Sequence, residues 1–148
     1  MQIVRLALQS DAFLAQIAYR AKARMQALGV PLLPRIAHRV AVMTAQVSIG
    51  DPVVVQPGVY IVHGQVVADG LMEIRTGTVL APWVTLGLIP PELVGPTIGP
   101  YAHIGTGARV LGNVRVGAEA RVGANAVVLD DVPDGATAIG IPARVVGA

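Results

Sequence analysis

Aliphatic residues return at every sixth position through the C-terminal third of this 148-residue chain. The uninterrupted members of this series are Ile98, Ile104, Val110, Val116, Val122 and Val128. Each is followed four positions later by another small or β-branched residue: Ala102, Ala108, Val114, Ala120, Ala126 and Val132. An α-helical period of 3.6 does not keep residues spaced by six on one stripe, and a strand of period 2 would not place glycines as regularly as Gly99, Gly105, Gly117 and Gly123. The pattern predicts short strands joined by tight turns, with three such units forming one 18-residue coil.

Coils of this kind stack as parallel strands about 4.8 Å apart, so the predicted fold is an all-β parallel β-helix. The six-residue rhythm begins at Ile49 and continues through Val55, Ile61 and Val67. One extra residue then shifts the phase near Gly70, and the series resumes at Ile74, Leu80 and Leu86. Residues 88–97 contain three prolines and no repeat, which indicates a loop that leaves the coil. Because Leu86 and Ile98 are twelve residues apart, we expect this loop to keep the phase of the repeat.

Two short amphipathic helices are predicted before the repeats, over residues 11–28 and 34–44. Ser10 is placed to cap the first helix and Gly29 to end it. The apolar positions are Leu14, Ile17, Ala18, Ala21, Met25 and Leu28 on the first helix, and Ile36, Ala37, Val40 and Met43 or Thr44 on the second. We expect both helices to pack on the first coil, whose strand groups would otherwise stay unpaired. The chain then divides into a helical segment, 1–46, and a β-helix domain, 47–148.

Composition narrows the possible functions. Charged residues make up 14% of the chain, few enough that we expect part of the outer surface to be buried against other subunits. The net charge of +2 does not suggest nucleic acid as a partner. The absence of cysteine excludes disulfides and cysteine-bound metals. The N-terminal residues lack the apolar core of a signal peptide, and no apolar run approaches a membrane span, so we expect a cytoplasmic protein without a membrane partner.

The sequence VLGNVRVGAEARVGANAVVLDDVPDGATAIGIPARVVG, residues 110–147, resembles the hexapeptide-repeat acyltransferases. Within that family it is most similar to the serine O-acetyltransferases and related sugar acetyltransferases, and the similarity extends over residues 30–148. The resemblance implies a left-handed β-helix, acetyl-CoA as acyl donor and a homo-oligomer. Family members carry a larger helical domain that pairs two trimers. The shorter helical segment here favours a trimer over a hexamer.

His63 is the candidate catalytic residue. It lies two positions after Ile61, where the resemblance implies the general base. An imidazole at this place accepts the proton of a hydroxyl as the oxygen attacks a thioester. A histidine in a turn, exposed to solvent or touching a neighbouring subunit, is the alternative interpretation. The other two histidines, His38 and His103, are expected to have surface or packing roles.

The sequence departs from the family at two positions of the site. The acid that orients the histidine is replaced by Ser48, and the second histidine, in the loop, corresponds to a position at or near Gly95. Three acids are candidates to replace the missing one: Asp51, Asp69 and Glu92. Nothing in the sequence selects among them.

Acetyl-CoA is expected to bind along one corner of the β-helix. Thr106 and Ala124 are 18 residues apart, so they are predicted to stack on successive coils and leave a groove. The resemblance implies that the pantetheine arm lies there, that Arg121 and Arg144 bind phosphates, and that backbone amides near Gly87 stabilise the oxyanion. Small residues also suit tight corners, and lone arginines are usually solvated. Extrapolating the coil count places His63 on a different corner from Thr106 and Ala124, which favours a site shared between subunits.

The predicted function is acetyl-CoA-dependent O-acetylation of serine or a related small acceptor with a hydroxyl group. A sugar O-acetyltransferase and a non-catalytic trimeric scaffold are the alternatives. A γ-type carbonic anhydrase shares the fold but needs three zinc-binding histidines, two of them close in sequence. His63 and His103 are 40 residues apart and His38 lies outside the repeats, so no metal is expected.

Overall fold

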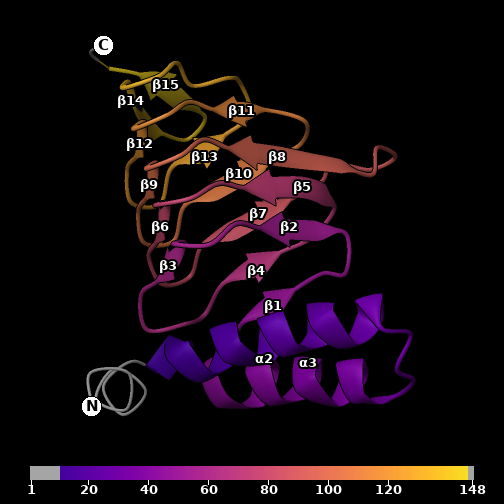
Figure 1. Ribbon diagram of the computed structural model, residues 1–148. Helices are drawn as coiled ribbons and strands as arrows, with labels where there is room; N and C mark the ends of the chain where they lie inside the picture. Colours follow the sequence, from indigo (N-terminus) through magenta and orange to yellow (C-terminus); the bar gives the residue numbers. More distant parts are fainter. Residues whose placement is uncertain (1–10, 147–148) are drawn as a thin grey trace.

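The computed structural model describes residues 11–146 as a three-faced β-helix standing on two helices (Figure 1). Each face is a sheet of parallel strands that are two to five residues long. The predicted all-β fold, a left-handed parallel β-helix with a short N-terminal helical extension, is confirmed.

The first face consists of β1 (Ser48–Ile49), β4 (Val67–Ala68), β7 (Thr85–Gly87), β10 (Arg109–Leu111) and β13 (Val127–Val128). The second consists of β2 (Val53–Val55), β5 (Leu71–Ile74), β8 (Val94–Ile98) and β11 (Arg115–Val116). The third consists of β3 (Tyr60–Ile61), β6 (Val79–Leu80), β9 (His103–Ile104), β12 (Arg121–Val122) and β14 (Thr137–Gly140). The last strand, β15 (Ala143–Val145), pairs antiparallel with β14 and closes the far end of the prism.

The six-residue series fills the interior as predicted from Ile98 onward. Ile104 pairs with Val122 and Val110 with Val128, and all four side chains are buried. The phase across the proline-rich loop is also confirmed, because Ile74 pairs with Ile98. Those two residues are 24 apart in sequence, whereas partners on regular coils are 18 apart. The loop therefore adds six residues without rotating any side chain out of the core.

The phase shift in the first coil lies earlier than the sequence predicted. Val67 is 44% exposed on the outer surface, whereas Ala68 is 1% exposed and fills the core position between Ile49 and Leu86. Tyr60 pairs with Val79 and Val67 with Thr85, so this corner contains one residue more than the corner above it. The extra residue is in the turn that contains His63. The assignment of Val67 to the interior was wrong, because two adjacent apolar residues do not reveal which one points inward.

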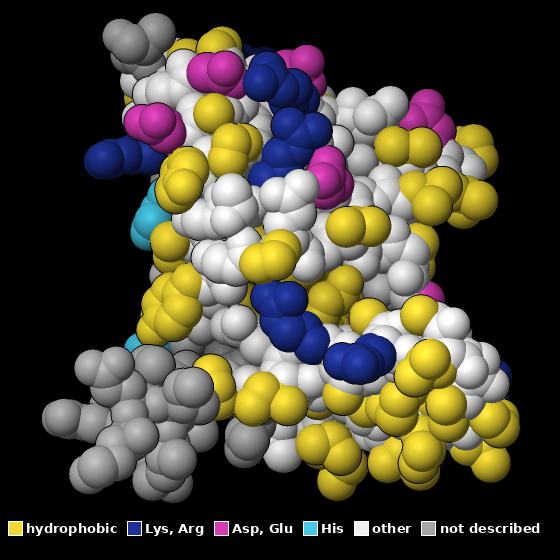
Figure 2. Space-filling model, viewed as in Figure 1, with side chains coloured by type: hydrophobic (Ala, Val, Ile, Leu, Met, Phe, Trp, Pro, Cys, Tyr) yellow, Lys and Arg dark blue, Asp and Glu magenta, His cyan; other side chains and the backbone are white. Residues whose placement is uncertain are grey.

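The two helices, α2 (Asp11–Ala27) and α3 (Leu33–Ala45), cover the first coil as expected (Figure 1). Ser10, the predicted cap, lies outside the described residues. The predicted apolar sides of the helices face the coil only in part: Ala18 belongs to the buried core, but the larger side chains do not. Side chains on the predicted sides, such as those of Ile17, Ile36 and Met43, are exposed, while small residues such as Ala41 and Ala45 make the contact. Figure 2 shows many hydrophobic side chains on the outer surface of these helices. No helix within residues 11–146 is long and apolar enough to cross a bilayer.

Polar side chains of α2 also fasten the helices to the first coil. Tyr19 donates its hydroxyl hydrogen bond to the carbonyl of Val53 at 2.8 Å. The ammonium group of Lys22 donates to the carbonyl of Ile49 at 2.8 Å and to Asp51 Oδ1 at 2.9 Å. The Lys22 side chain is only 4% exposed, so this charge depends on these oxygens for its stabilisation.

Replacing Asp51 with asparagine is expected to lower the free energy of unfolding at neutral pH by about 1 kcal/mol, because Lys22 stays buried without its carboxylate. The Lys22 hydrogen bond, followed by that of Gln26, lowers the pKa of Asp51 below its usual value. A carboxyl group with a lowered pKa stabilises the fold above its unfolded pKa. That contribution is lost as the pH falls through the lowered value, which places the transition below about pH 4.

Urea unfolding at pH 7 and in this acidic range measures the effect. Asp130→Asn is the matched control, because Asp130 contacts Arg144 at 3.4 Å in a pair that is exposed on both sides. We expect that control to stay within about 0.5 kcal/mol of the parent protein. Equal losses for the two variants would contradict a stabilising role for the Lys22–Asp51 pair.

Candidate functional site

One corner of the prism gathers three of the predicted site residues. This corner, here called the His63 seam, is the column of turns that joins the third face to the first: residues 62–66, 81–84, 105–108 and 123–126. Backbone hydrogen bonds connect its levels, from the amide of Trp83 to the carbonyl of Gln65 at 2.8 Å and from the amide of Asn125 to the carbonyl of Thr106 at 2.8 Å. His63, Thr106 and Ala124 therefore lie on one edge of the molecule.

The predicted placement of His63 on a different corner from Thr106 and Ala124 was wrong. The loop after β7 explains the error. The loop joins β7 on the first face to β8 on the second, and its six additional residues project outward at that corner, so they do not advance the chain by a further face. If these six residues are counted as a regular repeat, the predicted position of every residue before the loop is displaced by one corner relative to the residues after it. The predicted stacking of Thr106 and Ala124 on successive coils is confirmed, because no loop separates them.

His63 is held in an unusual backbone conformation. His63, Gly64 and Gln65 follow one another with φ angles of 59°, 97° and 53°, all in the left-handed region. A Cβ atom at position 64 would collide with the carbonyl oxygen of Ala45, so only glycine lets this turn close against the end of α3. The amide of Gln65 donates to that same carbonyl at 2.9 Å. Left-handed non-glycine residues cost free energy and are frequent at functional sites, which favours a role for the exposed His63 side chain.

The upper half of the seam is a narrow track of small residues. Thr106 and Ala124 are exposed on successive coils. A Cβ atom at Gly105 would lie 2.8 Å from the amide nitrogen of Ala124, so the coils approach this closely only because position 105 is glycine. None of the four turns of the seam contains Asp, Glu, Lys or Arg. The track therefore presents backbone and neutral side chains, which suits an uncharged, extended ligand such as a pantetheine arm.

The other predicted donor residues are more scattered. Arg121 lies on β12, on the third face beside the seam, and lines an open cavity of about 710 Å³ with Tyr101, His103 and Glu119. Gly87 ends β7, at the edge of the first face opposite the seam. Arg144 lies in the C-terminal hairpin, beside Asp130. Within one subunit the structure thus brings Arg121 near the seam but not Gly87, while Arg144 pairs with Ile139, which lies against Gly123 at the last level of the seam.

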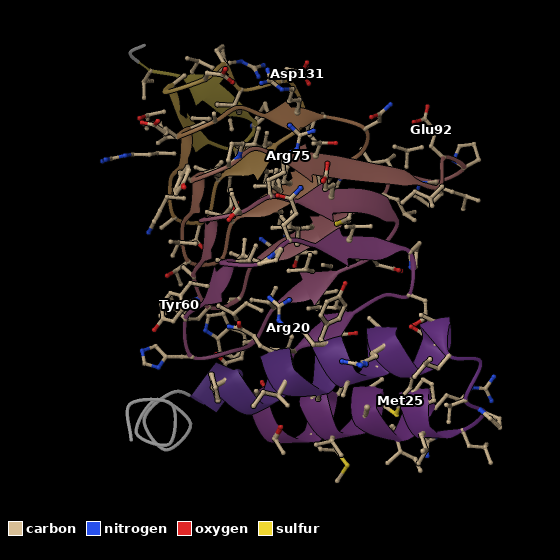
Figure 3. All side chains as sticks on the ribbon, in the orientation of Figure 1. Arg20, Met25, Tyr60, Arg75, Glu92 and Asp131 are labelled. Carbon is tan, nitrogen blue, oxygen red and sulfur yellow. The ribbon has the colours of Figure 1, made fainter. Side chains whose placement is uncertain are left out.

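A cleft of about 430 Å³ between α3 and the first coil is the main feature that sequence reasoning missed. Ser48, Asp51 and Asp69 line it from the β-helix, and His38, Arg35 and Arg39 line it from α3. The buried Lys22 also lines this cleft. Lys22 is the single lysine of the chain, and it was the only feature of the sequence that could have indicated the cleft. Asp51 and Asp69 follow β1 and β4, so they lie across the first face from His63. Glu92 stands on the projecting loop after β7 (Figure 3). None of the three candidate acids is on the His63 seam.

Over residues 11–146, no group of three or more His, Asp or Glu side chains lies close enough together to hold a metal ion. His38 is on α3, His63 is in the first turn of the seam, and His103 is on β9 of the third face.

Comparison with known proteins agrees with this architecture. The family model described as bacterial transferase hexapeptide (six repeats) matches residues 95–130. The chain is a hexapeptide-repeat protein. The serine acetyltransferase of Synechocystis sp. is 40% identical to it over 135 residues, which are 89% of this chain and 54% of that protein. The predicted resemblance to serine acetyltransferases is confirmed.

Solved structures of the same family superpose closely on this hexapeptide-repeat protein. Soybean serine acetyltransferase complexed with serine has a TM-score of 0.88 and 32% identity, covering 95% of this chain and 59% of that chain. A serine acetyltransferase in complex with CoA has a TM-score of 0.81 and 31% identity, covering 89% and 55%. The chain therefore spans a little more than half the length of these relatives.

Proposed function

We propose that this protein is an acyltransferase that moves the acetyl group of acetyl-CoA to the hydroxyl of serine or a related small acceptor, with His63 as the general base. The observation that carries the proposal is the His63 seam, on which an exposed histidine in a strained turn shares one edge with the small residues Thr106 and Ala124. The relatives support the reaction class, since they are named serine acetyltransferases and two of the solved structures hold serine and CoA.

The proposed reaction is a single acyl transfer. The acceptor oxygen attacks the thioester carbonyl while the His63 imidazole takes its proton. A new C–O bond forms, the C–S bond breaks, and the proton passes from the imidazolium to the departing CoA thiolate. Thr106 and Ala124 hold the pantetheine arm, and Arg121 on the flank of the seam binds a CoA phosphate. Arg144 is proposed for the same role at the C-terminal end.

We also propose a homotrimer acting in the cytoplasm, the compartment that supplies acetyl-CoA. Gly87 and the loop after it lie at another corner from His63, so their backbone amides reach a seam only from a neighbouring subunit. A threefold arrangement of prisms brings such a corner against each seam. The hydrophobic side chains exposed on the strand faces, among them Val54, Val67 and Leu71, support burial between subunits.

Two alternatives follow from the residues that differ from the family. By the resemblance, Ser48 and a position at or near Gly95 correspond to the orienting acid and the loop histidine, and Ser48 contributes no charge to the first coil. A sugar hydroxyl is therefore an alternative acceptor, and a non-catalytic trimer is an alternative to any enzyme.

Titration calorimetry with acetyl-CoA, followed by an assay of CoA thiol release with serine and with sugars, tests the proposal. We expect one acetyl-CoA site per subunit and acceptor-dependent thiol release. Ala124→Arg should abolish both, because the long side chain fills the track. Ala118→Arg is the matched control, since Ala118 is a small residue in a turn at a different corner, between β11 and β12. A folded trimer that does not bind acetyl-CoA would contradict the proposal and favour the scaffold.

A further inference from the structure

Trp83 is the only tryptophan in the chain, and the residue is 61% exposed to solvent. Its backbone has a φ of 68°, in the left-handed region that disfavours bulky side chains. The fold therefore holds a large aromatic ring in a costly conformation without burying it. Neither packing nor turn geometry explains a tryptophan at this position, which points to a ligand.

The position of Trp83 connects it to the proposed site. It occupies the second level of the His63 seam, directly above the turn of His63, and its amide donates to the carbonyl of Gln65 at 2.8 Å. Thr106 is on the next level and Ala124 on the one after. Adjacent levels are about 4.8 Å apart. A ligand lying on the Trp83 ring therefore sits between the proposed base and the proposed donor track.

The chemistry around Trp83 selects the class of ligand. A second exposed aromatic side chain, Tyr60, projects from β3 on the same coil as His63 (Figure 3). The turns of the seam have no charged side chain, whereas serine carries an ammonium and a carboxylate that need partners of opposite charge. A sugar ring is neutral, has an apolar C–H face that stacks on an aromatic ring, and carries hydroxyls along its edge. It matches the neutral turns of the seam within one subunit, which offer serine no charged partner.

We propose that Trp83 is a stacking platform for the acceptor and that the acceptor is a neutral sugar ring, with one ring hydroxyl directed at His63. This inference rests on the proposed acetyl transfer and names its substrate class. Trp83 acts as a specificity-determining residue: it orients the ring, while His63 takes the proton of the reacting hydroxyl.

The single tryptophan supplies a direct binding measurement that does not depend on catalysis. Intrinsic fluorescence of the full-length protein is recorded during titration with methyl β-D-glucopyranoside, methyl β-D-galactopyranoside and N-acetylglucosamine, and separately with L-serine and with CoA. We expect at least one sugar to cause a saturable change in Trp83 emission and L-serine to cause none. A response to CoA alone would identify Trp83 as part of the donor site, and a response to serine would return the acceptor to an amino acid. Either result overturns the inference.

Trp83→Gly supplies the kinetic test, because glycine accepts the left-handed conformation and should leave the melting temperature unchanged or higher. We expect KM for the sugar to rise about tenfold with little change in CoA affinity, and Trp83→Tyr to recover most of the loss. Tyr101→Gly is the matched control: Tyr101 is also exposed, also left-handed with a φ of 58°, and lies at a different corner. An unchanged KM in Trp83→Gly, or its conversion to monomers, would assign the ring to a subunit contact instead.

The two proposals fail in different ways. Saturable sugar binding without any thiol release would support the role of Trp83 as a stacking platform and contradict the proposed acetyl transfer. Thiol release with serine, together with no fluorescence response to sugars, would support the proposed acetyl transfer and contradict the role of Trp83 as a stacking platform.

Discussion

Replacing His63 with asparagine is expected to lower kcat/KM for acetyl transfer by about 10²- to 10⁴-fold, the usual contribution of a positioned general base. Asparagine tolerates the left-handed conformation of this turn better than most residues do, so the backbone should persist. The affinity for acetyl-CoA should stay within about twofold of the parent, since Thr106 and Ala124 are on other levels of the seam. Initial rates of thiol release measure the effect.

The matched control is His103→Asn, which removes an exposed imidazole from β9 on the third face, outside the turns of the seam and beside Arg121. We expect it to keep the parent kcat at saturating acetyl-CoA. If His63→Asn retains full activity, the base is a different group. The cleft beside Asp51 and Asp69 would then be the first place to search for the base, because several other titratable side chains line it near the first coil.

The regular part of the fold was predictable because the inward-facing residues of a β-helix recur in the sequence at one fixed interval. From Ile98 to Val128 the inward positions follow at every sixth residue, and pairing partners such as Val110 and Val128 are one coil apart. The same regularity located Thr106 and Ala124. Where spacing alone decides the geometry, the sequence is sufficient.

Insertions are different, because their effect depends on where the added residue goes in space. The turn of His63 holds one extra residue, and the apolar pair Val67 and Ala68 allows it to be placed on either side. The loop after β7 adds six residues, the length of one full repeat, but these residues project outward at the corner between the first and second faces and add no further corner. The corner on which His63 lies follows from the path of the chain and not from the count.

The helical segment shows the same limitation for burial. Helical periodicity identified α2 and α3 but assigned their apolar sides to the coil, whereas small residues and the Lys22 side chain make that contact. A close approach between a helix and the end of a β-helix favours alanine over larger side chains. A lysine becomes buried only when oxygens such as those of Ile49 and Asp51 are in reach, and pattern alone does not reveal such partners.

Introducing an aspartate at position 68 is expected to be the most destabilising of the substitutions considered for this chain. Ala68 is almost fully buried between Ile49 and Leu86 on the neighbouring coils, and the buried cation nearby, Lys22, is already bonded to Ile49 and Asp51. An unpaired buried charge costs about 3–5 kcal/mol or more, so the melting temperature should fall by roughly 10 °C. Thermal and urea unfolding of Ala68→Asp against the parent protein measure both quantities.

Val67→Asp is the matched control, one residue away with its side chain on the outer surface. Because water solvates that carboxylate, we expect a loss below about 1 kcal/mol. Sedimentation separates this small loss from any effect on the proposed trimer, since Val67 lies on a face that neighbouring subunits would cover. The uninterrupted six-residue series, which places Val67 in the core, predicts the opposite order of the two variants. If Val67→Asp proved the more destabilising substitution within an intact oligomer, the extra residue would follow β4, and the turn that presents His63 would have regular length.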